Sequence, residues 1–469
     1  VEGILMIPSL VVSVIYGESA FAAFLIPIVL SVAAGTLLTI KKPSNPDIFA
    51  KEGFVTVGLS WIIMSLIGAL PFVIDGCIPS FVDAFFETVS GFTTTGASIL
   101  TEIESLGRGM LFWRSFTHFV GGMGVLVFVL AILPQADTRS VKLMHVMRAE
   151  VPGPKVGKLV SKIGRTARIM YGIYIGLTVI EMILLLAGGM PVYGSIVNSF
   201  ATAGTGGFAI KNASIAAYDS AYIDYVIGIF MFLFGVNFNL YYLILIGHVG
   251  EALRSEELRW YLIITGVSTA LIAADIYEIF GTVGESVRYA FFQVTSVMST
   301  TGFATSDYNA WPALSKVILA LLMFCGACVG STTGGIKVGR IILLVKSGLR
   351  EVKYMLHPRA VVAVRSEGKP VERDVLRGAN SYMIVYIMLF TVSLFLVEMV
   401  EECDLVTGFT AVSACLNNVG PGLGEVGPAG NFSALTPFTK ILLSVDMLAG
   451  RLEIFPLLML FAPSTWRGR

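Results

Sequence analysis

Long apolar stretches alternate with short polar connections along the whole chain. About ten stretches are rich in Leu, Ile, Val and Phe with few charges, and about 20 apolar residues suffice for a helix to cross a bilayer. The pattern therefore predicts a series of membrane helices, of which the first is short. The stretches cover roughly residues 4–16, 20–40, 54–74, 111–133, 169–186, 222–248, 260–280, 311–345, 382–400 and 438–462.

Composition supports the same class. Of the 469 residues, 55% are hydrophobic and 14% are charged, against roughly 45–50% and 25% in a soluble domain. The 32 basic and 32 acidic residues balance, which does not suggest a partner such as nucleic acid. Only four histidines are present, and they are scattered through the sequence. A membrane enzyme would be expected to cluster His, Asp and Glu, so we expect neither an enzyme nor a bound cofactor.

The five cysteines do not suggest a disulfide scaffold, because they are odd in number and scattered. Cys325 and Cys328 form a C-x-x-C pair inside an apolar run. A second pair or a neighbouring histidine would be needed for a zinc site, and the sequence offers neither there. We expect this pair to serve helix packing.

Four shorter segments lie between the long stretches and end in Gly, Thr, Ser or Asn. They begin near Asp83, Tyr193, Val283 and Leu405. Since ten to fifteen residues are too few to span a bilayer, re-entrant helices are expected. The four segments align as FFETVSGFTTTG ending at Gly96, SIVNSFATAGTG ending at Gly206, FFQVTSVMSTTG ending at Gly302 and FTAVSACLNNVG ending at Gly420.

This repetition predicts an all-α polytopic membrane protein with one central pore. Four copies of helix, re-entrant pore helix, filter loop and helix would surround the pore, and two N-terminal helices would precede them. The predicted parts are a helix pair at 1–41, a first pore repeat at 42–150, a second at 151–256, a third with an intramembrane loop at 257–358, and a fourth at 359–469.

Loop charges predict the orientation. The segments 137–168 and 346–377 are rich in Lys and Arg, so the positive-inside rule assigns them to the cytoplasm. The glycine-ended segments then open outward. Acidic residues on that side would raise the local cation concentration, although ordinary loop polarity explains each of them equally well. These acids are Glu102, Glu104, Asp219, Asp224, Asp307 and Glu425.

The glycine-ended segments have the chemistry of a cation filter. Irregular backbone is tolerated at membrane depth only when it is buried in protein or lines a polar cavity. A ring of carbonyl oxygens can replace the hydration shell of a cation, and glycine adopts the backbone angles that direct carbonyls to one side. The negative ends of the preceding helices would also favour cations.

Several motifs together resemble one known family, the Trk/Ktr/HKT superfamily of potassium-uptake proteins, and within it the membrane subunit of the Trk system. The resemblance extends over essentially the whole chain. The motifs are TTTGAS at 93–98, TGGF at 205–208, STTGFAT at 299–305, NNVGPGLGEVG at 417–427, RAEVPGP at 148–154, HPRAV at 357–361 and GRLEIF at 450–455.

By this resemblance, one filter glycine comes from each repeat and K⁺ is the transported ion. The second and fourth segments depart from the hydroxyl-rich pattern of the other two, so we expect an uneven ring with modest K⁺ over Na⁺ discrimination and acceptance of Rb⁺. The predicted ion-binding residues are Thr93, Thr94, Thr95, Gly96, Ala203, Gly204, Thr205, Gly206, Ser299, Thr300, Thr301, Gly302, Asn417, Asn418, Val419 and Gly420.

A gate is predicted below the filter. The stretch 311–345 is interrupted by GACVGSTTGGIKVGR at 326–340, whose glycines disfavour a continuous helix. The resemblance implies a loop that obstructs the pore, whereas close packing of small residues is the alternative. The predicted gate residues are Gly330, Ser331, Thr332, Thr333, Gly334, Gly335, Lys337 and Arg451.

Charged residues within the apolar stretches need compensation, because a charge at the centre of a bilayer is costly. Arg451 could pair with Asp446, Glu453 or another carboxylate, act as an electrostatic barrier beneath the filter, or do both. Arg114, His118 and Glu181 are expected to pack as polar contacts between helices rather than to relay protons.

Function and partners follow from the resemblance. It implies a gated K⁺ uptake protein of the cytoplasmic (inner) membrane, with a proton- or sodium-coupled symporter on the same architecture as the alternative. It also implies a homodimer and a cytosolic TrkA-like ring that binds nucleotide. The two basic segments are candidate docking surfaces for that ring, and topology alone explains them equally well.

Overall fold

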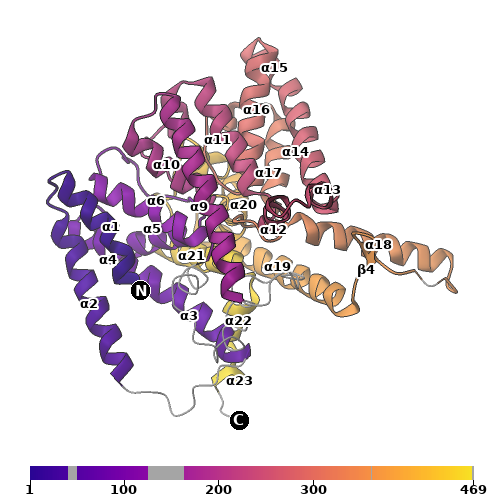
Figure 1. Ribbon diagram of the computed structural model, residues 1–469, viewed down its shortest axis with the longest axis horizontal. Coiled ribbons are helices and arrows are strands. Elements are labelled where there is room, and N and C mark those ends of the chain that lie inside the picture. Colours follow the sequence, from indigo (N-terminus) through magenta and orange to yellow (C-terminus); the bar gives the residue numbers. More distant parts are fainter. Residues whose placement is uncertain (41–49, 125–162, 361, 467–469) are drawn as a thin grey trace.

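The computed structural model describes residues 1–40, 50–124, 163–360 and 362–466. Helices dominate these residues, as the sequence predicts, and pack around one another without a large sheet (Figure 1). The basic segment 137–168 lies almost entirely outside the described residues, as do the RAEVPGP motif and the second half of the stretch 111–133. The first helices are α1 (Glu2–Ile15), α2 (Phe21–Ile40), α3 (Ala50–Gly68), α4 (Leu70–Asp75) and α6 (Arg108–Gly122).

Five helical segments are long and apolar enough to cross a membrane among the described residues, and a sixth qualifies if a bent pair is one span. They are α2, α3 with α4, α9 (Ile163–Ala187), α14 (Glu256–Asp275) and α19 (Arg373–Val400), and the bent pair is α11 (Ala221–Phe234) with α12 (Phe238–Leu245).

The stretch 222–248 is not the single helix that its hydropathy predicts. The helix bends by 92° between α11 and α12. The freed backbone groups are satisfied by another segment: the Phe238 amide donates to the Gly330 carbonyl, and the Cys328 amide donates to the Gly235 carbonyl, both at 3.0 Å. Tertiary hydrogen bonds therefore replace the missing helical ones, as burial requires.

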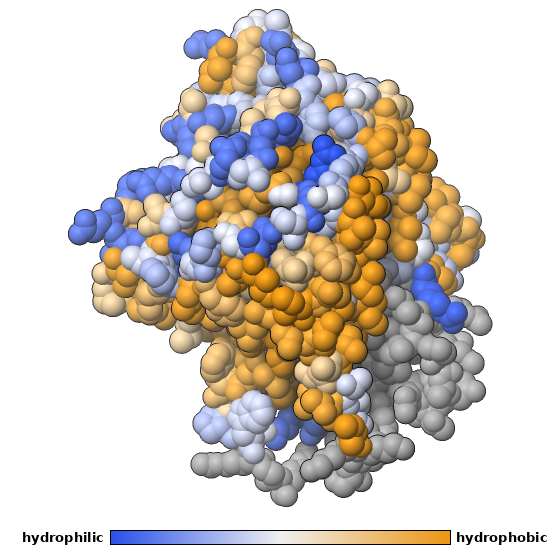
Figure 2. All heavy atoms as spheres, turned by 90° about the vertical axis from the view of Figure 1, so that its left-hand side faces the viewer, coloured by the Kyte–Doolittle hydropathy of each residue, from blue (hydrophilic) through white to orange (hydrophobic). Residues whose placement is uncertain are grey.

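Apolar side chains form a broad band on the outer surface. Figure 2 shows hydrophobic residues across the middle of one face, with hydrophilic residues gathered above the band and a smaller group below it. Helix α2 contributes strongly, because Leu37, Leu38 and Ile40 are each more than two-thirds exposed. Exposed apolar surface on this scale fits a lipid environment and not water.

Four short helices dip into the protein between the long ones. They begin within two residues of the predicted positions and are 12 to 16 residues long. The third of them is capped by Thr282, whose hydroxyl accepts from the Glu285 amide at 3.3 Å. The re-entrant helices are α5 (Phe81–Phe92), α10 (Val192–Gly204), α16 (Val283–Met298) and α20 (Leu405–Leu416).

The stretch 311–345 is interrupted as predicted. Helix α17 (Ala313–Phe324) ends in an irregular loop, and α18 (Val338–Leu356) begins after it. The two ends of the loop pair as short parallel strands, β1 (Cys325–Gly326) with β2 (Ile336–Lys337). We call residues 325–337 the intramembrane loop.

The C-terminal stretch also divides, because α21 (Pro437–Arg451) ends before α22 (Phe455–Phe461) begins. The remaining elements are short. They are α13 (Val249–Leu253), α15 (Tyr277–Phe280), α23 (Pro463–Trp466), the 3₁₀ helices η1 (Ser214–Tyr218), η2 (Tyr308–Ala310) and η3 (Gly424–Val426), and the antiparallel strands β3 (Arg365–Ser366) and β4 (Lys369–Pro370).

Candidate functional site

The four re-entrant helices end in the same backbone turn. In each, a residue just past the helix reaches the left-handed region although it is not glycine: φ is 55° at Thr94, Thr205 and Asn418 and 54° at Thr300. This conformation costs roughly 1–2 kcal/mol for such residues. Strain repeated at four equivalent positions must be imposed by the surrounding structure, and such strain is typical of functional sites.

Hydrogen bonds define the common register. The amide that follows the strained residue donates back to the helix at 2.8–2.9 Å in all four cases. A glycine with positive φ comes next, at Gly96, Gly207, Gly302 and Gly420. We call these four turns, with their glycines, the filter segments: residues 93–96, 204–207, 299–302 and 417–420.

The predicted alignment of the second segment is therefore one residue out of register. Gly207, and not Gly206, occupies the position of Gly96, and Ala203 lies in the last turn of α10. The T-G-G sequence contains two adjacent glycines, so the sequence alone does not show which of them is equivalent to Gly96. The positive φ of 76° at Gly207 distinguishes it.

The four glycines approach one another in a closed cycle. A Cβ added to Gly96 would overlap the Gly206 carbonyl oxygen, one on Gly207 would overlap that of Thr301, and one on Gly302 would overlap that of Val419. A Cβ on Gly420 would lie 2.6 Å from the Thr95 carbonyl oxygen, so the cycle of contacts closes at the first segment. Equivalent carbonyl groups from four distant parts of the chain thus surround one axis.

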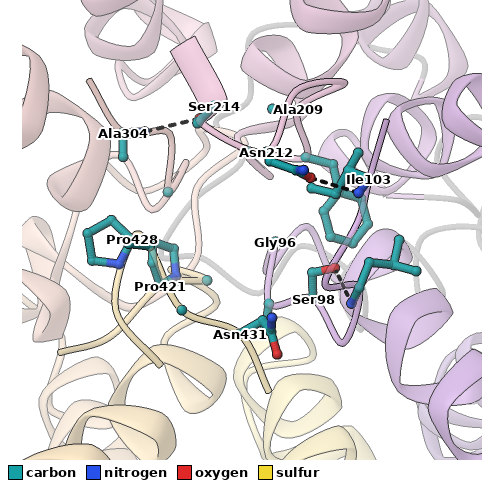
Figure 3. Close-up of a pocket in the computed structure, with 18 of the residues that line it drawn as sticks. Gly96, Ser98, Ile103, Ala209, Asn212, Ser214, Ala304, Pro421, Pro428 and Asn431 are labelled. Carbon is teal, nitrogen blue, oxygen red and sulfur yellow. Dashed lines mark hydrogen bonds between the residues drawn. The ribbon is translucent and has the colours of Figure 1, made fainter. Parts of the chain in front are cut away.

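A cavity opens at the glycine end of the ring. It has a volume of about 150 Å³, and all four positive-φ glycines line it. Figure 3 shows loops from four parts of the chain around this opening, with Gly96 on one of them and Pro421 on another. Hydrogen bonds from the Ile103 amide to Asn212 (2.7 Å) and from the Ala304 amide to Ser214 (3.3 Å) join these loops.

The intramembrane loop packs against the third and fourth filter segments. The Gly334 amide donates to the Thr300 hydroxyl at 2.7 Å, and a Cβ on Gly334 would lie 2.5 Å from the Asn417 carbonyl oxygen. Gly334 thus contacts two filter segments, and the other predicted gate residues of this loop lie within four residues of it: Gly330, Ser331, Thr332, Thr333, Gly335 and Lys337.

Arg451 ties this loop to α6. Its guanidinium donates to the Thr332 carbonyl at 2.7 Å and to the carbonyls of Gly121 and Gly122 at 2.6 and 2.7 Å. Among the carboxylates expected nearby, Glu453 pairs with Arg340 at 2.6 Å and Asp446 accepts from Ser393 at 2.8 Å. The arginine is thus held by backbone carbonyls, which the sequence did not suggest.

Two further side chains hold the loop. Lys337 donates to the carbonyls of Thr333 and Gly334. The half-buried Glu257 carboxylate accepts from the amides of Val329 at 2.8 Å and Gly339 at 2.9 Å, and so bridges both sides of the loop. Glu257 stands at the start of a long apolar helix, where an acidic residue is unremarkable, and nothing in the sequence marks it.

The acidic residues near the outer mouth are mostly engaged with other groups. Glu104 pairs with Lys211 at 2.8 Å, and this hydrogen bond lowers the pKa of Glu104 and raises that of Lys211. Asp224 lies 3.6 Å from Arg288, and Asp307 caps Asn309 at 3.0 Å. Glu104 and Asp224 are therefore paired with basic side chains, whereas Asp307 keeps its negative charge.

The fold and the site describe an integral membrane protein in which re-entrant helices present a closed ring of backbone carbonyls. Residues 20–467 match the family model for TrkH, described as a cation transport protein. The chain belongs to the TrkH family, which confirms the resemblance inferred from its motifs.

Similar proteins span the same length. The chain is 37% identical to the Trk system potassium uptake protein TrkH of Escherichia coli, over 99% of this chain and 96% of that protein. It is 35% identical to TrkH of Halomonas elongata, over 98% and 96%. The crystal structure of the potassium transporter TrkH from Vibrio parahaemolyticus matches with a TM-score of 0.88 and 31% identity, over 99% of this chain and 96% of that one.

Asn418 provides a test of the ring's construction. Its side-chain amide donates to the Thr95 hydroxyl and to the Met447 carbonyl, both at 2.9 Å. We expect Asn418→Ala to lower the free energy of unfolding by about 2–3 kcal/mol, because two buried hydrogen bonds are lost. Thermal unfolding in detergent measures this.

Asn431→Ala is the matched control, since Asn431 lies at the mouth and caps only the Ser433 amide. Its cost should stay below about 1 kcal/mol. Equal melting temperatures for the two variants would show that Asn418 does not hold the ring together.

Proposed function

We propose that this chain takes up K⁺ across the cytoplasmic membrane, through a selectivity filter formed by the four filter segments. The observation that carries the proposal is the closed cycle in which each positive-φ glycine abuts a carbonyl of the next segment. The K⁺ uptake named for its relatives in Escherichia coli and Halomonas elongata supports the choice of ion.

Electrostatics explains why such a ring suits a cation. An ion in a low-dielectric medium loses solvation worth tens of kcal/mol, and carbonyl oxygens held at fixed positions can replace the lost water. The preceding helices point their C-terminal ends at the ring, which adds partial negative charge. A four-repeat architecture, with one pore helix and one filter segment per repeat, would supply these groups evenly around the axis.

The filter segments are not chemically equal, so discrimination between ions would be modest. The first and third carry hydroxyls at three positions before the glycine, whereas the second has Gly204, Thr205 and Gly206. The side-chain hydrogen bonds that hold the backbone of each filter segment differ in the same way. We therefore propose moderate preference for K⁺ over Na⁺, with Rb⁺ accepted.

The intramembrane loop would act as the gate. It packs directly against Thr300 and Asn417, on the side of the ring opposite the outer cavity. The positive charges of Arg451 and Lys337 lie on the same loop or in contact with it. Movement of the loop would open the path, carry the Lys337 charge away from it and break the hydrogen bond between Arg451 and the loop.

A homodimer and a cytosolic nucleotide-binding ring complete the proposal. Helix α18 extends away from the helical body (Figure 1) and exposes Val345, Leu349, Val352 and Met355 by 55–78%. These positions recur every three or four residues, as in a helix-packing stripe. A second copy of the chain could cover them, while the basic segment 346–377 would face the ring protein.

The filter glycine of the second segment tests the proposal. We expect Gly207→Ala to abolish Rb⁺ uptake by proteoliposomes, because the added Cβ meets the Thr301 carbonyl and the positive φ becomes strained. Gly176→Ala on α9 is the control, since nothing lies within 4 Å of its added Cβ. Wild-type uptake by correctly folded Gly207→Ala protein would refute the filter.

The gate is tested at Gly334. A methyl group there would lie 2.5 Å from the Asn417 carbonyl oxygen and push the loop from the ring. We expect Gly334→Ala to raise K⁺ current in planar bilayers while the ratio of Na⁺ to K⁺ permeability stays the same. Gly348→Ala on α18, which meets no neighbour within 4 Å, should change neither. A changed permeability ratio with unchanged current would contradict a gating role.

Substitutions at Arg451 can separate the effect of its charge on K⁺ flux from the effect of its hydrogen bonds. If its charge forms an electrostatic barrier, Arg451→Ala should raise K⁺ flux and Arg451→Lys should leave it near that of the wild type, because only the first change removes the charge. Flux through reconstituted, monodisperse protein measures this. Unaltered flux in Arg451→Ala would exclude the barrier.

A further inference from the structure

The second filter segment lacks the side-chain bonds that brace the others. Hydroxyl pairs link Thr93 to Thr95 at 2.8 Å and Ser299 to Thr301 at 2.7 Å. Asn418 anchors the fourth segment. In the second segment, the Thr205 hydroxyl donates only to the neighbouring Gly204 carbonyl at 2.7 Å, and glycine occupies the other three positions. Glycine-rich backbone is the most flexible kind, so this segment needs support from outside.

One face of α6 supplies that support. A Cβ on Gly206 would overlap the His118 ring, and a Cβ on Gly122 would lie 2.6 Å from the Gly204 Cα. Residues 114, 118 and 122 are one turn apart and therefore share this face. The α6 face thus packs against Gly204 and Gly206 of the second segment.

Phe208, the residue just after this segment, is clamped between two side chains of that face. The Arg114 guanidinium lies 4.1 Å from the centre of the Phe208 ring, and the His118 ring stacks on it with the centroids 4.2 Å apart. Cation–π and stacking contacts fix the ring's orientation, and the exit of the segment is fixed with it.

Arg114 also reaches the exit of the first segment. It pairs with the Glu87 carboxylate at 2.8 Å and donates to the Ser98 hydroxyl and the Ala209 carbonyl, both at 3.3 Å. Glu87 in turn accepts from the Ile99 amide at 3.0 Å. One planar guanidinium therefore joins the residues that follow Gly96 to those that follow Gly207, and both charged side chains are at most 2% exposed.

Stability alone does not account for such a pair. The desolvation penalty of a buried ion pair often equals its attraction, so an apolar replacement would stabilise the fold about as well. A guanidinium with several fixed donors does something different, because it sets the distance between the groups that it bridges.

We propose that Arg114 is a positioning residue that fixes the spacing of the first and second filter segments and so sets the discrimination between K⁺ and Na⁺. The inference rests on the proposed filter. A filter distinguishes ions through the placement and number of its carbonyl oxygens, and Arg114 holds the least braced of the four segments.

The test compares Arg114→Lys with Arg288→Lys. Lysine keeps the charge at position 114 but cannot bridge Glu87, Ser98 and Ala209 at once. Arg288→Lys is the matched control: Arg288 also faces a carboxylate, Asp224, and an aromatic ring, Tyr289, but neither partner belongs to a filter segment. Reversal potentials of reconstituted protein in mixed K⁺ and Na⁺ give the permeability ratio.

We expect the ratio of Na⁺ to K⁺ permeability to rise severalfold in Arg114→Lys and to stay unchanged in Arg288→Lys. An unchanged ratio in Arg114→Lys overturns the inference, and so does an equal rise in both variants. If Arg114→Lys protein does not fold, Phe208→Leu removes the clamped ring but leaves the ion pair. It should also raise the ratio, and a wild-type ratio there overturns the inference.

Failure of the filter itself would look different. If Gly207→Ala abolishes uptake while Arg114→Lys keeps the wild-type ratio, the filter stands and only the role of Arg114 falls. If Gly207→Ala transports as the wild type does, the proposed function fails whatever Arg114 does.

Discussion

The rest of the structure depends on one constraint: four segments must bring their backbones together inside a membrane, where unsatisfied polar groups are costly. Only glycine permits the approach, since a Cβ on Gly96, Gly207 or Gly302 would overlap a neighbouring carbonyl oxygen. The strained turn before each glycine then has to be held in place. The re-entrant helices and the side chains packed around their ends hold these four turns.

The supports differ from segment to segment, although the turns are alike. Hydroxyl pairs brace two of them, Asn418 anchors a third, and the α6 face with Arg114 and His118 packs against the glycine-rich one. A common backbone shape is therefore maintained by three different kinds of contact. This is expected where packing, and not a shared motif, determines geometry.

The intramembrane loop is held by contacts that are individually modest. Arg451 donates to carbonyls on both the loop and α6, Lys337 donates to the loop itself, and Glu257 accepts from backbone amides on both sides of it. Hydrogen bonds to charged groups contribute roughly 1.5–3 kcal/mol each. If the loop is the proposed gate, such a set would hold it in place and still let it move when a comparable free energy is supplied.

Hydrophobic pattern, segment length and glycine content, taken from the sequence by itself, determined the helical membrane class, the starts of the re-entrant helices within two residues, and the interruption of the stretch 311–345 by the run at 326–340. These features depend on local composition, because the thickness of the bilayer sets how many apolar residues a spanning helix needs. Tertiary structure alone decided the bend between α11 and α12, the carbonyl partners of Arg451 and the choice of Gly207 over Gly206. Each of those depends on which distant backbone group lies opposite, and two adjacent glycines are identical until a neighbouring carbonyl oxygen approaches one of them.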